Sequence, residues 1–147
     1  MGASSWSYFV PYQPDVNAAL RQLRQSVFEQ GDYWWAVKGE FGPASAYPDR
    51  PTRMDDLLAD ELVQECGTHS ILDMEHVLAE GEEPYDGAVL PVTAAEARAA
   101  AGTEVLTREH VQAIDGLANR WWVGRCAVLH DEYGNPTELY FWGFSGD

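Results

Sequence analysis

Positive charge is scarce in this chain of 147 residues, which has nine Lys and Arg against 24 Asp and Glu and a formal net charge of −15. Nucleic-acid binding depends on Lys and Arg side chains that release counter-ions from phosphates. We therefore expect neither direct nucleic-acid binding nor attraction to anionic membrane surfaces. Only Lys38 is a lysine, and the excess of Arg together with Ala-rich stretches favours a GC-rich, bacterial coding sequence.

Long apolar runs and cysteines are also scarce. No segment approaches the roughly 18 consecutive apolar residues that span a bilayer, and no basic head precedes an apolar stretch at the start. We therefore expect a cytoplasmic protein. Two cysteines, Cys66 and Cys126, are few for a disulfide framework, and we expect both to stay reduced.

The sequence contains no Gly-rich phosphate loop, His-Glu-x-x-His helix or calcium-loop spacing. Cys66 and His69 have Cys-x-x-His spacing, but no second Cys or His pair lies near enough to complete a structural zinc site. The carboxylates around Cys66 disfavour a reactive thiolate. We therefore predict no cofactor and no bound metal.

The composition is that of a globular protein, with 46% hydrophobic and 12% aromatic residues. The pattern predicts a single acidic α+β domain over residues 1–147, with a mixed or antiparallel sheet, a C-terminal β-hairpin and about four covering helices. Strands are expected at 6–10, 33–37, 68–78 and 85–92, and the segment 38–51 is expected to be a loop because it holds three prolines and two glycines.

Four helices are predicted from apolar periodicity and capping residues. The first has an apolar stripe of Val16, Leu20, Leu23 and Val27 and ends at Gly31. The second begins after Thr52, buries Met54, Leu57, Leu58 and Leu62, and ends at Gly67. The third follows a capping box at 93–96 and ends at Gly102. The last begins at Thr107, with an inner stripe of Val111, Ile114, Leu117 and Trp121.

The segments 121–130 and 137–144 predict a hairpin, because an Asp-Glu-Tyr-Gly-Asn-Pro turn joins two strand-like runs. The second run is apolar on both faces, so we place the hairpin at the centre of the sheet. In each of the pairs Trp34-Trp35 and Trp121-Trp122, strand alternation predicts that at most one ring is deeply buried.

His69, Asp73 and Glu75 are the candidate catalytic residues. If 68–78 is a strand, residues two apart share a face, and an imidazole and two carboxylates then project together. His76 lies on the opposite face in that case. A helix would instead group His69, Asp73 and His76. An outward-facing polar strand surface explains the same pattern without any chemistry.

The segment 54–97 holds half of the carboxylates of the chain and no Lys or Arg. They are Asp55, Asp56, Asp60, Glu61, Glu65, Asp73, Glu75, Glu80, Glu82, Glu83, Asp86 and Glu96. Neighbours of one sign cannot neutralise each other, so this segment faces either water or a positively charged partner.

The sequence therefore predicts a monomeric acidic module that binds a basic protein partner through Asp55, Asp56, Asp60, Glu61 and Glu65. Its charge and size resemble those of acidic inhibitors such as immunity proteins, although no motif identifies a family. The alternative is a small enzyme or ligand-binding domain with an aromatic-lined pocket, in which His69, Asp73 and Glu75 supply the polar groups.

Overall fold

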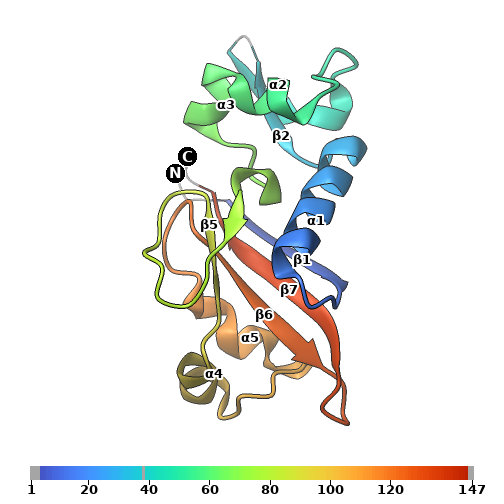
Figure 1. The fold of residues 1–147 in the computed structure, drawn as a ribbon. Helices are drawn as coiled ribbons and strands as arrows, with labels where there is room; N and C mark the ends of the chain where they lie inside the picture. Colours follow the sequence, from blue (N-terminus) through green and yellow to red (C-terminus); the bar gives the residue numbers. More distant parts are fainter. Residues whose placement is uncertain (1–3, 38, 146–147) are drawn as a thin grey trace.

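The computed structural model describes residues 4–37 and 39–145 as a single α+β domain (Figure 1). The strands are β1 Ser5–Pro11, β2 Trp34–Val37, β3 Glu40–Pro43, β4 His76–Val77, β5 Ala88–Pro91, β6 Gly124–His130 and β7 Pro136–Phe144. The α-helices are α1 Val16–Gln30, α2 Met54–Ala59, α3 Glu61–Cys66, α4 Ala94–Ala101 and α5 Val111–Ile114. The 3₁₀-helices are η1 Ala44–Ala46, η2 Ile71–Asp73, η3 Arg108–His110 and η4 Asp115–Leu117.

The main sheet is mixed and has the strand order β1-β7-β6-β5-β4. Strands β1, β7 and β6 are antiparallel neighbours, whereas β6, β5 and β4 run parallel. The predicted C-terminal hairpin is β6-β7, and β7 lies between β1 and β6. The interior position expected from its apolar faces is therefore confirmed.

Alternate residues of β7 enter different hydrophobic clusters. Leu139 and Phe141 pack in a cluster with the buried stripe of α1, and Tyr140 and Trp142 pack in a second cluster beneath α4 and α5. Because side chains alternate across a strand, the two clusters lie on opposite faces of the sheet. Both faces of the sheet are thus covered.

The second sheet contains only β2 and β3, which pair antiparallel. In Figure 1 the strand β2 lies with α2 and α3 at one end of the molecule, and α4 and α5 lie at the other. Trp35 and Leu57 are buried in the same cluster as α1, which joins this end to the main sheet. Strand β3 falls within the segment that we predicted as a loop, so that prediction was wrong there.

The first helix is confirmed. Its predicted stripe faces the core, Asp15 caps its start by accepting a hydrogen bond from the Ala18 amide, and Gly31 ends it with φ 69°. The helix also holds the edge of the main sheet, because the Asn17 amide both accepts from Val77 N–H and donates to its carbonyl. An edge strand covered in this way is closed to further pairing.

The second predicted helix is two helices. Asp60 has an extended backbone, with φ −70° and ψ 128°, and it separates α2 from α3. Thr52 is not the N-cap, since Arg53 occupies that position without a side-chain bond. The break changes the direction in which later residues face, so that Val63 is buried and Leu62 is 41% exposed. The prediction of a single stripe that includes Leu62 was therefore wrong.

Three further predictions were too long. The expected strand 68–78 is η2 followed by the two residues of β4, and the expected strand 85–92 is reduced to β5. The last helix begins at the Thr107 cap as predicted but ends at Leu117 after mixed α and 3₁₀ turns. Trp121 lies beyond it in a turn and is 54% exposed, so its expected place on an inner stripe was wrong.

Candidate functional site

The carboxylates predicted to bind a partner gather on two consecutive short helices. Asp55 and Asp56 occupy the first turn of α2, and α3 carries Glu61 in its first turn and Glu65 near its end. We call these four residues and Asp60 the acidic surface, because all five are exposed. Acidic residues in a first turn favour helix formation through the positive end of the helix dipole, which helps to explain why they are tolerated there.

Asp60 has a structural role within the acidic surface. Its carboxylate accepts hydrogen bonds from the backbone N–H groups of Leu62 and Val63, at 2.9 and 3.4 Å. These bonds satisfy donors that a helix start leaves unpaired. Asp60 therefore caps α3, and only Asp55, Asp56, Glu61 and Glu65 have no role in a cap.

The acidic surface is barely neutralised. Within residues 4–37 and 39–145, its one ion pair joins Arg53 to Asp55 at 3.9 Å, and these side chains are 71% and 89% exposed. An exposed pair at this distance contributes little free energy. The negative charge of α2 and α3 is therefore available to solvent and to a partner.

Asp73, a predicted catalytic candidate, is a largely buried carboxylate at the end of η2. One oxygen accepts bonds from the Thr68 N–H and hydroxyl at 2.7 and 2.9 Å, and the other accepts from the Ser145 hydroxyl at 2.7 Å. Burial nevertheless raises the pKa of Asp73, because desolvation outweighs these bonds. Asp73 thus ties the segment after α3 to the end of β7.

His69 is not part of one constellation with Asp73 and Glu75, because no strand places them on a shared face. Its backbone has φ 51°, and its Nδ1 lies within hydrogen-bond distance of the Ser4 hydroxyl. The imidazole packs edge-on against Phe41, with 4.9 Å between ring centroids. It lines a hollow with Tyr8 and Trp34, away from the cleft described next.

Asp73 and Glu75 do meet, at a cleft of about 440 Å³ beside α3. We call it the α3 cleft. Its walls are Arg24, Leu58, Val63, Gln64, Glu65, Leu72, Asp73, Glu75, Asp86, Gly87 and Trp122. Two of the three predicted catalytic residues therefore share a concave site with a tryptophan, and one residue of the acidic surface, Glu65, lies at the same site.

Trp122 is held in an unusual conformation at this cleft, with φ 63°. A positive φ is an outlier for a bulky residue. The backbone N–H of Trp122 donates to Phe144 O at 3.1 Å, and its backbone carbonyl accepts from Gly87 N at 2.7 Å. The ring packs on Gly67, where an added Cβ would lie 2.6 Å from the Trp122 Cη2 atom. Sequence reasoning had singled out the Trp-Trp pair but had no signal for this cleft.

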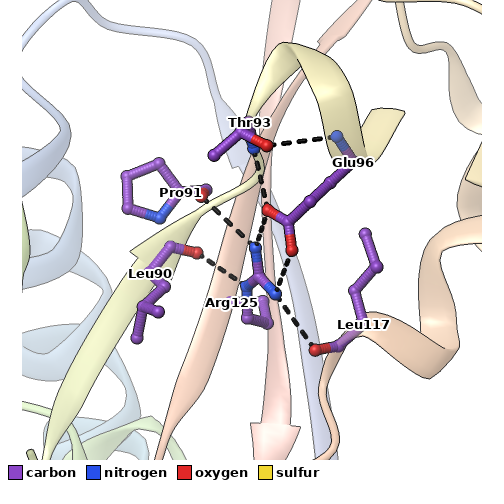
Figure 2. Close-up of polar contacts among 6 residues, drawn as sticks. All are labelled: Leu90, Pro91, Thr93, Glu96, Leu117 and Arg125. Carbon is purple, nitrogen blue, oxygen red and sulfur yellow. Dashed lines mark hydrogen bonds and ion pairs between the residues drawn. The ribbon is translucent and has the colours of Figure 1, made fainter. Parts of the chain in front are cut away.

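The most completely paired polar cluster is elsewhere, between the sheet and α4 (Figure 2). Arg125 of β6 donates from Nε to Leu90 O at 3.1 Å, and from its terminal nitrogens to the carbonyls of Pro91 and Leu117 at 3.3 and 3.1 Å. The same nitrogens bind both carboxylate oxygens of Glu96, at 2.5 and 3.0 Å. All five guanidinium N–H donors are thus used.

Glu96 links this cluster to the start of α4. It accepts from the Thr93 N–H at 3.0 Å, while the Thr93 hydroxyl accepts from Glu96 N–H at 3.1 Å, which confirms the predicted capping box. The Arg125 guanidinium, with help from the Thr93 N–H, holds the pKa of Glu96 below its usual value. A charge pair with every donor satisfied and 9% exposure of the Arg side chain is structural.

The described part of the chain contains no group of three His, Cys, Asp or Glu side chains arranged to hold a metal ion. None of its helices has the length and apolar character required to cross a bilayer. Cys66 and Cys126 are both free thiols, and burial raises the pKa of Cys126 to about 12.

Comparison with known proteins gives no relative: no family model, no curated protein and no solved structure matches this chain.

Proposed function

We propose that this protein is a small acidic binding module that docks a basic protein partner on the acidic surface and inhibits it, in the manner of an immunity protein. The observation that carries this proposal is the exposure of five carboxylates on α2, on α3 and at the residue between them. The ion pair that one of them makes, Asp55 with Arg53, is weak. Surfaces of opposite charge accelerate encounter, so the proposal predicts rapid, salt-sensitive association.

Solvation of an acidic helix face is the competing explanation, and a charge-matched pair of variants separates the two. In the surface variant, Asp55→Lys, Asp56→Lys and Glu61→Lys reverse charge on α2 and α3 while leaving the Asp60 cap and Glu65 in place. In the control variant, Glu109→Lys, Asp115→Lys and Glu132→Lys reverse three exposed charges elsewhere. Both variants carry the same net charge.

The experiment captures proteins from native lysate with each tagged variant at low and high salt, identifies them by mass spectrometry, and measures the purified partner by calorimetry. We expect one stoichiometric basic partner that binds the wild-type protein and the control variant and is lost from the surface variant. Equal binding to the two variants would show that only net charge matters, and the proposed docking surface would be wrong.

A second candidate function is ligand binding or catalysis in the α3 cleft. The observation that favours it is the meeting of Asp73 and Glu75 beside Trp122. A pair of carboxyl groups in different environments suits acid and base roles. His69 lines a different hollow, so the imidazole is not a wall of the α3 cleft. Two results together would favour this candidate over docking. Turnover of a substrate should be saturable and lost in Glu75→Gln, and the surface variant should capture the partner as well as the wild-type protein does.

A further inference from the structure

The α3 cleft is lined by both aliphatic and acidic residues. Leu58 and Val63 come from α2 and α3, and Leu72 comes from η2, so aliphatic surface reaches the cleft from three elements. Glu65, Glu75 and Asp86 are exposed carboxylates on its walls. Long cationic side chains pack their methylene groups on apolar surface while their charged ends reach polar groups. The lining fits such a side chain.

The positive charges near the cleft compensate its carboxylates only in part, and the Arg24 charge acts on Glu75 and Asp73. Arg24 is the cation among the lining residues, and its Nη2 donates to Leu72 O at 3.3 Å. Within the ranges that the structure describes, no ion pair involves Arg24. Arg120 lies outside the lining set and pairs with Asp86 at 3.7 Å, with both side chains more than half exposed. Within the described residues, neither Glu65 nor Glu75 forms an ion pair.

Asp73 is a further, largely buried carboxylate of the cleft. Its oxygens have hydrogen-bond donors, but no Lys, Arg or His of the described chain forms an ion pair with it. The Arg24 charge acts on Asp73 without forming an ion pair, and a buried carboxylate is costly unless a counter-charge is paired with it. An amide at this position would keep the same bonds, since its oxygen would accept from Thr68 and its NH₂ would donate to Ser145. Hydrogen bonding alone therefore does not require an acid here.

Trp122 supplies an aromatic wall at the same point. Its ring lies over Gly67 and near Asp73, because an added Cβ on Gly67 would meet both Trp122 Cη2 and an Asp73 oxygen within 3.0 Å. Trp122 is only partly buried. The face of an indole ring attracts ammonium and guanidinium groups, and Trp is the best of the aromatic residues for this contact.

We propose that the α3 cleft receives one Lys or Arg side chain of the basic partner, with its stem on Leu58, Val63 and Leu72 and its charge against Asp73, Glu75 and Trp122. This inference rests on the proposed function and names the anchor of that interface. A single cationic side chain in a central pocket, surrounded by the weaker contacts of the acidic surface, is the usual distribution of binding energy at an interface.

The test uses N-acetyl-arginine methylamide as the probe and the citrulline derivative, which is nearly the same shape but neutral, as its control. Binding is followed by tryptophan fluorescence and by NMR shifts of the Gly67 and Gly87 amides. We expect saturable binding of the arginine probe alone, weakened by about tenfold in Asp73→Asn and in Glu75→Gln because each removes one charge from the site. Urea unfolding checks that both variants fold.

Glu109→Gln serves as the matched control and should leave probe affinity unchanged, since Glu109 lies outside the cleft. Equal binding of the citrulline derivative, no saturation by the arginine probe, or unchanged affinity in Asp73→Asn would each overturn the inference.

Failure of this inference is distinguishable from failure of the proposed function. The surface variant keeps every cleft residue, so it should bind the arginine probe like the wild-type protein while losing the partner. If the probe does not bind but the surface variant still loses the partner, the cleft is not the anchor and the docking surface stands. If the probe binds and the surface variant keeps the partner, the acidic surface is not the docking site and the anchor role falls with it.

Discussion

The two ends of this molecule use charge in opposite ways. At the end that carries α4 and α5, ion pairs join Arg98 to Glu104, Arg108 to Glu138 and Arg125 to Glu96. At the end that carries α2 and α3, five exposed carboxylates share one weak pair with Arg53. Paired charges at the first end connect elements of the fold, whereas most of the exposed charges at the other end form no ion pair and give the surface its field.

Aromatic rings pack against one another at both ends, for example Trp34 on Phe41 beside β2 and β3. On the α5 side of the sheet, Phe9, Tyr140 and Trp142 stack in succession, with centroid distances of 4.7 and 4.9 Å. Arg108 covers the outer end of the stack, 3.9 Å from the Phe9 ring centre. At the other end, Trp122 lines the α3 cleft instead of extending a stack. Similar residue types are therefore structural where their donors and ring faces all have partners, and available for binding where they do not.

The largest loss of stability is expected for Arg125→Ala. It removes the Arg125 donors from three carbonyl groups and from the Glu96 carboxylate, which keeps only the Thr93 N–H. We expect a loss of about 3–5 kcal/mol in the free energy of unfolding. Urea denaturation measures it. The matched change at the acidic end, Arg53→Ala, should cost no more than about 0.5 kcal/mol because its pair is exposed. Similar losses for the two variants would contradict the division.

Arg108→Ala tests the aromatic stack and should have a smaller effect. The guanidinium makes a bidentate pair with Glu138, at 2.8 and 2.6 Å, and covers Phe9. Because this site is exposed, we expect a smaller loss of stability than in Arg125→Ala, measured by thermal and urea unfolding. Arg108→Lys keeps the charge but not the fork, and it should recover only part of the loss. A full recovery would mean that geometry is unimportant here.

The pH dependence of stability should have opposite signs at Glu96 and Asp73. The pKa of Glu96 is lowered in the folded protein, so its contribution is present above its usual pKa of 4.5 and is lost as pH falls through the lowered folded pKa. Glu96→Gln should therefore cost most at neutral pH and least in acid. Urea unfolding between about pH 3 and pH 7 measures the difference.

The contribution of Asp73 to stability should have the opposite dependence on pH. Its pKa is raised in the folded protein, so ionisation costs stability as pH rises from the usual pKa of 3.8 through the folded pKa. Asp73→Asn keeps the bonds to Thr68 and Ser145, and its stability relative to the wild-type protein should increase with pH. The same unfolding series measures it. A relative stability that falls with pH would show that the carboxylate is stabilising and has an unrecognised counter-charge.

Much of the fold could be predicted because its signals are local. The stripe and Gly31 end of α1, the capping box before α4, and the β6-β7 hairpin each depend on residues within a few positions of each other. Apolar content on both faces also placed β7 correctly inside the sheet. These signals concern turns and periodicity, which the sequence displays directly.

The site was less predictable because tertiary contacts determine it. Alternation favoured a strand at 68–78, but the Ser70 hydroxyl accepts from Leu72 N–H and caps η2, which removes the shared face. Asp60 similarly caps α3, and this cap divides the predicted second helix into two. No local pattern reveals that Arg24, Asp86 and Trp122 meet Asp73 at one cleft, since these residues come from four separate segments.

The rate of association with the captured basic partner is the most direct test of the central claim that the unpaired charges of α2 and α3 form a docking surface. Stopped-flow measurements at low and high salt compare the wild-type protein, the surface variant and the control variant. We predict a fast, salt-sensitive rate for the wild-type protein and the control variant, and a rate reduced by about tenfold or more for the surface variant at low salt. Equal rates for the two variants would contradict the claim.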